Sequence, residues 1–182
     1  MHMTTRHLFL DLEDTVIAPV MNGWFNTHLV NTQKVKAIIA DWKPDQVHLF
    51  SFAVWNKEEH KRFQMGTQER LERVFDIKFA STWTVDDDII PMCCSVMRIN
   101  QSSVDFSEMS NFWSKHQAFR LCMMHKFKLS WKTWQHENEV LLLDDAVFNE
   151  TFHWPDLHVR GTVANIDNLP EPWHALNCTD PS

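Results

Sequence analysis

The chain has 182 residues, of which 44% are hydrophobic and 23% are charged. These proportions are typical of folded globular proteins, and this length lets one domain bury a sizeable core. No apolar run approaches the roughly 20 residues that a membrane-spanning helix needs. The composition therefore excludes a disordered or membrane-spanning chain and predicts a single domain over residues 1–182.

Charge and glycine content exclude further classes of protein. The 24 acidic residues outnumber the 17 basic ones and give a formal net charge of -7, so the molecule as a whole does not attract nucleic-acid phosphates. With only 3 Gly, the chain contains no glycine-rich phosphate loop and no dinucleotide-binding fingerprint. Any contact with a nucleic acid must therefore be local.

Cysteine content and the N-terminal residues predict the compartment. The 4 Cys are too few and too irregularly spaced for a disulfide framework. The apolar stretch near the N-terminus is short and ends in acidic residues, unlike a signal peptide. We expect a cytoplasmic protein with no membrane partner.

Strand-like and helical patterns alternate in the first half of the chain. Four-residue runs rich in apolar side chains favour strands at residues 7–10, 47–50 and 77–80. Between these runs, the spacing of apolar residues and the helix-favouring composition predict helices over residues 32–42 and 57–75.

The second half is less regular at first. Residues 81–110 combine three consecutive Asp, a proline and a polar stretch, which predicts a loop-rich insertion able to form a small lid. A helical pattern resumes over residues 114–127, with Ser114 as its N-cap. Residues 140–143 form the clearest buried strand, and residues 158–163 the last one. Strands alternating with helices predict an α/β fold with a Rossmann-like parallel sheet and helices on both faces.

Polar residues follow three of the predicted strands. The first strand ends in DLEDT at residues 11–15, the second in Ser51, and the strand at 140–143 in Asp144 and Asp145. Right-handed crossovers bring the carboxyl ends of parallel strands to one edge of the sheet. Carboxylates gathered there repel one another unless a cation neutralises them, and Mg²⁺ prefers such oxygen ligands.

These segments resemble the motifs of a known family. LFLDLEDTV at residues 8–16 resembles the first motif of the haloacid dehalogenase-like (HAD) phosphohydrolases, a buried strand followed by D-x-D-x-T. Ser51 resembles their second motif, Lys115 the third, and LLLDD at residues 141–145 the double-aspartate fourth. The order agrees with the family, and the resemblance is closest to its small or capless members.

The resemblance implies roles for the matching residues. Asp11 would attack phosphorus and form an aspartyl-phosphate. Ser51 and Lys115 would hold and neutralise the phosphoryl oxygens, and Thr15 would orient the loop of the first motif. The implied activity is that of a Mg²⁺-dependent phosphomonoesterase.

The metal ligands and the proton carrier follow from the same resemblance. Asp11, Asp144 and the main-chain carbonyl of Glu13 would bind Mg²⁺, with Asp145 supporting the metal or its waters. The family's hydrolases normally carry Asp as general acid and base two residues after the nucleophile, where this chain has Glu13. The longer arm displaces the carboxyl group by about one ångström, which can cost on the order of 100-fold in rate.

The spacing of the motifs suggests the kind of substrate. The residues between 16 and 51 suffice for a flap and a helix but not for a large cap, so we expect an open site. Trp24 and Phe25 fall where the family has its mobile flap and are candidates to stack on a base. The expected partner is a nucleotide or a nucleic-acid phosphate end.

Several alternatives remain open. One is a catalytically weakened binding or regulatory protein of the same fold, and another is a phosphoprotein phosphatase. Each motif also has an ordinary structural explanation, since Asp-rich turns cap helices and most Trp pack in cores. The lysine of the third motif has nearby competitors in Lys126, Lys128 and Lys132. The pair Cys122 and His125 fits core packing better than a zinc site.

Overall fold

A six-stranded sheet forms the centre of the protein in a computed structural model, which describes residues 3–21, 23–107, 112–128 and 136–170. The strand order is β3-β2-β1-β4-β6-β5. Every neighbouring pair is parallel except β5 and β6. The strands are β1 (Met3–Leu10), β2 (Gln46–Phe50), β3 (Phe79–Trp83), β4 (His136–Asp144), β5 (Glu150–Trp154) and β6 (Val159–Asn165).

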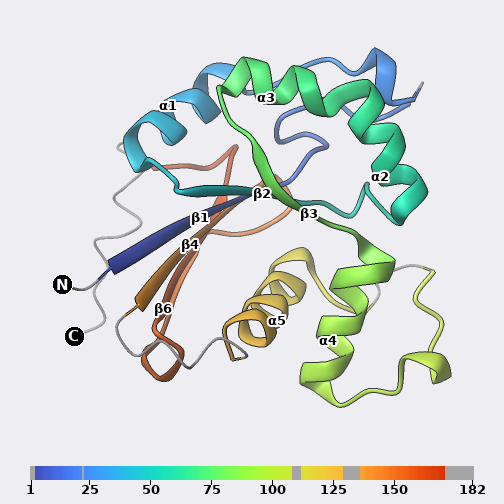
Figure 1. The fold of residues 1–182 in the computed structure, drawn as a ribbon, viewed down its shortest axis with the longest axis vertical. Coiled ribbons are helices and arrows are strands. Elements are labelled where there is room, and N and C mark those ends of the chain that lie inside the picture. The colour runs from blue at the N-terminus through green and yellow to red at the C-terminus, as the bar shows by residue number, and fades with distance from the viewer. Residues whose placement is uncertain (1–2, 22, 108–111, 129–135, 171–182) are drawn as a thin grey trace.

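Helices cover both faces of this sheet (Figure 1). The segments α1, α2 and α3 lie on one face, and α4 and α5 lie on the other. The helices are α1 (Thr32–Trp42), α2 (Lys57–Phe63), α3 (Glu69–Phe75), α4 (Ile90–Met97) and α5 (Lys115–Lys128). The expected α/β architecture with a mostly parallel sheet is therefore present. No described helix has the length and apolar character needed to cross a membrane.

Two apolar cores fill the space between the sheet and its helices. Leu8 and Leu10 of β1 belong to the core under α1 and α3, whereas Phe9 belongs to the core under α4 and α5. Successive side chains of a strand point to opposite faces, so a strand covered on both sides must be apolar throughout. This explains why the buried parts of the central strands are mostly apolar.

Two sequence-based expectations need correction. Residues 81–97 are not loop-rich, because β3 extends to Trp83 and a helical turn (Val85–Ile89) leads into α4, whose Cys93 and Cys94 are buried in the core. Residues 108–110 lie outside the described residues. The third strand begins at Phe79, because Asp76 adopts a left-handed conformation that ends α3 one residue before the expected strand start.

The strand β5 was not predicted. It forms an antiparallel hairpin with β6 at the edge of the sheet. The ring of Phe152 lies across its register partner Gly161, where any Cβ atom would overlap it. Glycine at this position therefore lets the two strands approach.

A chain of polar side chains crosses the core beneath α5. Trp83 Nε1 donates to Ser81 Oγ at 3.0 Å, and Ser81 Oγ lies 2.6 Å from His48 Nδ1. His48 Nε2 lies 3.2 Å from His7 Nδ1, and His7 Nε2 lies 3.0 Å from Asn138 Oδ1. An indole only donates and an amide oxygen only accepts, so every hydrogen bond of this chain can be made in one direction with both histidines neutral.

This chain makes stability depend on pH. Burial, with His7 and Lys126 nearby, lowers the pKa of His48 to about 3, and burial also lowers the pKa of His7. In the unfolded chain these rings regain a pKa of about 6.5 and bind protons that the folded state does not. The free energy of unfolding should therefore fall as the pH decreases from about 6.5 towards 3, by up to about 1.4 kcal/mol per pH unit for each ring.

Urea unfolding of the wild type and of His48→Gln between pH 7.5 and pH 5 tests this expectation. Glutamine keeps a donor and an acceptor at the site but does not titrate. We expect the variant to show a smaller loss of stability on acidification. Parallel pH profiles of the two proteins would contradict this assignment.

Candidate active site

The ends of two central strands, β1 and β4, bring acidic residues together. In the register of the sheet, Leu10 of β1 pairs with Leu143 of β4, so Asp11 and Asp144 follow adjacent strand ends. The Asp11 amide donates to the Leu143 carbonyl at 3.0 Å and continues the ladder by one step. Both carboxylates are buried. The sequence prediction that these two motifs meet at one sheet edge is confirmed.

Lys115 lies between these two carboxylates. Its Nζ is 2.7 Å from Asp11 Oδ1 and 2.9 Å from Asp144 Oδ2, and its side chain is only 9% exposed. Lys115 opens α5, where Ser114 Oγ accepts from the amide of Gln117 and the Gln117 side chain accepts from the Ser114 amide. This reciprocal cap fixes the start of the helix and therefore the place from which Lys115 reaches the site.

The competing lysines do not occupy this position. Lys126 lies in the last turn of α5, with Nζ 5.5 Å from the centre of the Trp83 ring, and burial lowers its pKa. Lys128 is the exposed last residue of α5. Lys132 lies outside the described residues. Of the candidate lysines for the third motif that lie within the described residues, Lys115 is the one beside Asp11.

The loop after β1 holds the Asp11 carboxylate from its other side. Thr15 Oγ1 donates to Asp11 Oδ2 at 3.1 Å. The amides of Thr15, Val16 and Ile17 all donate to the Leu12 carbonyl, which closes a compact turn. Both oxygens of Asp11 therefore have fixed partners, Lys115 on one and Thr15 on the other.

Burial and charge act against each other in this cluster. Burial raises the pKa of Asp144 to about 6, although Lys115 lowers it. Burial also raises the pKa of Asp145, and the charge of Asp11 adds to this effect. Burial alone would lower the pKa of Lys115, but Asp11 and Asp144 together raise it above its ordinary value. One ammonium therefore faces three carboxylates, and the site favours a further cation.

The donor set fits a hard metal ion. Asp11, Asp144 and Asp145 each offer a carboxylate oxygen, and these atoms all lie within 4.8 Å of one another. Asp144 Oδ2 is fully buried and, apart from its ion pair with Lys115, has no hydrogen bond of good geometry. An all-oxygen set of this kind is what Mg²⁺ prefers. The Glu13 side chain is not part of this group of described residues.

Glu13 is engaged with its own loop. Its Oε1 accepts from the amide of Val20 at 2.8 Å, and its backbone pairs with Ile17. This contact ties the segment after the first motif to the motif itself. One carboxylate oxygen of the expected proton carrier therefore already has a structural partner.

Ser51 follows β2 and is buried. Its Oγ accepts from the Ala53 amide at 3.2 Å and forms a tight turn at the strand end. A hydroxyl that accepts in this way keeps its own proton for donation. Ser51 can therefore donate to an oxygen placed beyond the end of β2.

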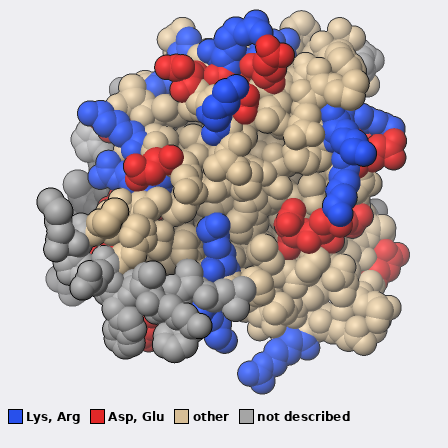
Figure 2. Space-filling view, in the orientation of Figure 1, with Lys and Arg blue, Asp and Glu red and all other residues tan. Residues whose placement is uncertain are grey.

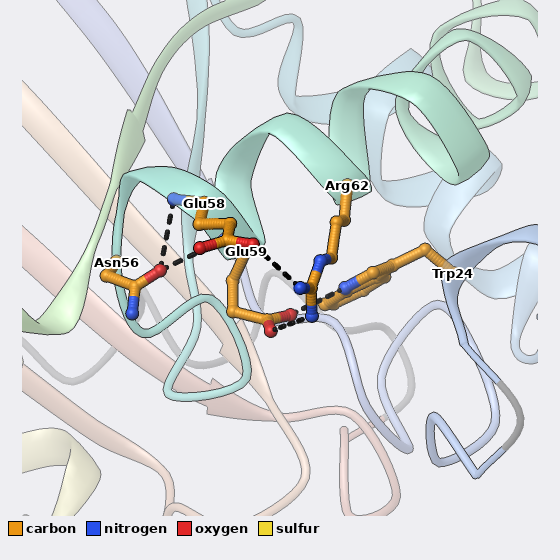
Figure 3. A network of polar contacts seen from close by, with 5 residues as sticks. All are labelled: Trp24, Asn56, Glu58, Glu59 and Arg62. Carbon is orange, nitrogen blue, oxygen red and sulfur yellow. Dashed lines mark hydrogen bonds and ion pairs between the residues drawn. The ribbon is translucent and has the colours of Figure 1, made fainter.

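Trp24 does not lie in the open site that the sequence suggested. It is 4% exposed, its ring packs edge-on against Phe63, and its Nε1 donates to Glu59 Oε2 at 2.9 Å (Figure 3). A Cβ on Gly66 would lie 2.8 Å from the Trp24 backbone, so the flap and the middle of the α2–α3 segment touch directly. A ring buried in this way has no free face for a base. Phe25, by contrast, is 64% exposed.

Two residues near the site, Phe52 and Asn165, belong to no motif recognised in the sequence. The ring of Phe52 lies 4.6 Å from Lys115 Nζ. Asn165, at the end of β6, donates to the carbonyls of Asp145 and Val147 and holds the loop after β4. The sequence marks Asn165 only as a polar residue at the end of a strand. It marks Phe52 only as an aromatic residue directly after Ser51.

Comparison of the chain with protein-family models, with curated proteins and with solved structures finds no match. The site is therefore interpreted from its own geometry.

Metal binding is directly testable by thermal unfolding. Mg²⁺ at tenfold excess over its dissociation constant should stabilise the folded protein by about 1.4 kcal/mol and raise Tm by about 3–6 °C. Asp145→Asn should remove most of this rise, and it should also raise the Tm measured with a chelator, because it relieves repulsion among the carboxylates.

Asp14→Asn is the matched control. Asp14 is exposed beside the site and has φ 58°, a conformation that asparagine tolerates. This control should keep the rise in Tm on adding Mg²⁺. The same rise in all three proteins would refute a metal site at these carboxylates.

Proposed function

We propose that this chain is a Mg²⁺-dependent phosphomonoesterase that works through an aspartyl-phosphate, as its resemblance to the HAD-like phosphohydrolases implies. The observation that carries the proposal is the position of Asp11. Its two carboxylate oxygens are held by Lys115 and Thr15, and it lies beside Asp144 and Asp145 at the end of β1. A carboxylate fixed in this way is oriented for attack and costs little further ordering.

In the first step, a carboxylate oxygen of Asp11 bonds to phosphorus while the ester P–O bond breaks. The departing alkoxide takes a proton from Glu13. In the second step, Glu13 takes a proton from water, which attacks phosphorus and releases phosphate and the Asp11 carboxylate. Splitting one displacement into two in this way is the advantage of a covalent intermediate.

Electrostatics decides whether Asp11 can approach a phosphate dianion. Lys115, which is paired with Asp11 before substrate binds, would transfer part of its interaction to the phosphoryl oxygens. Ser51 would donate to a second phosphoryl oxygen from the end of β2. The chemistry supplied by bound Mg²⁺ is neutralisation of the charge shared by the phosphoryl group and the carboxylates.

The charge on the molecular surface bears on the class of substrate. On the face drawn in Figure 2, most basic side chains lie close to acidic ones. Together with the net charge of -7, this supports a nucleotide or a nucleic-acid end over a long polymer. Phe25 remains a candidate to contact the substrate from the flap.

One observation supports a second candidate, a regulatory or binding protein with weakened turnover. The contact between Glu13 and the Val20 amide occupies an oxygen of the acid to which the resemblance assigns proton transfer. If the contact persists with substrate bound, phosphate would bind but turn over slowly. The two candidates differ in rate, not in binding.

Replacing Asp11 with Asn tests the nucleophile. With Mg²⁺ and 4-nitrophenyl phosphate, we expect kcat to fall by at least about 1,000-fold, because the substitution removes the attacking charge with almost no change in volume. Asp14→Asn makes the same chemical change on the neighbouring residue and should keep most of the activity. Equal rates for the two variants would mean that Asp11 is not the nucleophile.

Replacing Glu13 with Gln tests proton transfer while keeping an oxygen for the Val20 amide. A good leaving group such as 4-nitrophenolate needs little protonation, whereas the alkoxide from benzyl phosphate needs it. We expect kcat to fall by about 100-fold on benzyl phosphate and by much less on 4-nitrophenyl phosphate, with Tm unchanged. A uniform loss on both substrates would assign Glu13 a structural role only.

A further inference from the structure

We propose that Phe148 is the surface on which an aromatic ring of the leaving group packs, so that the site prefers phosphate monoesters whose leaving group carries a flat ring, as a nucleotide does. This inference rests on the proposed function and assigns the aromatic contact to a residue outside the flap.

Phe148 lies in the loop that also carries two of the clustered carboxylates. Asp144 ends β4, Asp145 follows it, and the chain reaches Phe148 before β5 begins at Glu150. Although phenylalanine is strongly apolar, this side chain is 61% exposed. Among the exposed large apolar side chains of the described residues, it alone lies in the loop that leaves the carboxylate cluster.

The ring of Phe148 is held from one side by His116. The two ring centres are 4.1 Å apart with an angle of 78° between the planes, which is an edge-to-face contact. His116 directly follows Lys115 in α5, so the residue that holds Phe148 is covalently joined to the residue that holds Asp11. Phe148 therefore packs on the first turn of α5, the turn that carries Lys115, and lies three residues after Asp145.

His116 is itself anchored. Its Nε2 lies 2.7 Å from Glu150 Oε2, and Arg120 NH1 lies 2.6 Å from Glu150 Oε1. The Arg120 guanidinium in turn lies 5.4 Å from the centre of the Phe152 ring. This series of contacts fixes the imidazole on which Phe148 rests.

The backbone of the loop is fixed as well. Asn165 donates to the carbonyls of Asp145 and Val147, and the Ile166 amide donates to the Asp144 carbonyl at 2.9 Å. An exposed aromatic ring on a rigid loop loses little entropy when a second ring packs on it. Its exposure is unfavourable in the free protein and is relieved when a ligand covers it.

Phe52 gives the site a second aromatic wall. Its partly buried ring lies beside the Lys115 ammonium on the β2 side, and His116, the next residue of α5, holds the ring of Phe148. A phosphate that binds Lys115 would carry its leaving group past these rings. A leaving group that carries a flat aromatic ring suits this path better than a sugar without one.

Two phosphonates that cannot be hydrolysed test the inference independently of turnover. Benzylphosphonate and (cyclohexylmethyl)phosphonate have the same connectivity and charge but differ in aromaticity. Binding of each is measured by calorimetry with Mg²⁺ for the wild type, Phe148→Leu and Phe25→Leu. Leucine keeps an apolar side chain and removes the ring.

We expect the wild type to bind benzylphosphonate about fivefold more tightly than its saturated analogue, the size of one aromatic pair. Phe148→Leu should reduce this preference to less than about twofold, and Phe25→Leu should keep it. No preference in the wild type, no binding of either phosphonate, or loss of the preference in Phe25→Leu alone would overturn the inference.

These outcomes are separate from those of the proposed function. If Phe148→Leu loses the preference but Asp11→Asn keeps its activity, the aromatic contact stands and the aspartyl-phosphate mechanism fails. If Asp11→Asn is inactive and Phe148→Leu keeps the preference, the mechanism stands and the selection by Phe148 fails.

Discussion

The ion pair of Lys115 with Asp11 and Asp144 is the interaction on which the site depends. Two buried carboxylates at adjacent strand ends would repel each other, and burial raises the pKa of Asp144 to about 6. The positive ammonium between them offsets this repulsion. Removing the lysine would leave the two carboxylates buried without a compensating charge. The third carboxylate, Asp145, leaves the cluster with excess negative charge, which a metal ion can balance.

The fold supplies this arrangement through its most rigid parts. Asp11 and Asp144 follow two central parallel strands, and Lys115 begins a helix that Ser114 and Gln117 cap. Because each group comes from the end of an element packed in the core, small movements of surface loops do not disturb their separation. The contacts of Thr15 and Asn165 then fix the two loops that leave the site.

Local patterns predicted much of this structure, and long-range packing determined the rest. The helix Thr32–Trp42 has the predicted bounds, because its apolar spacing and Pro44 are local signals. The helix α4 was read as loop since Pro91 and the run of Asp break most helices, but both stand near a helix start, where they are favourable. The burial of Trp24 depends on Glu59 and Gly66, which no local pattern connects to it.

The stereochemistry at phosphorus tests the central claim, that Asp11 forms a covalent intermediate. A phosphate monoester made chiral with oxygen isotopes would be hydrolysed in isotopically labelled water, and the configuration of the product phosphate determined. Two successive in-line displacements each invert phosphorus, so attack by Asp11 followed by water predicts overall retention. Overall inversion would mean that water attacks directly, and it would contradict the account.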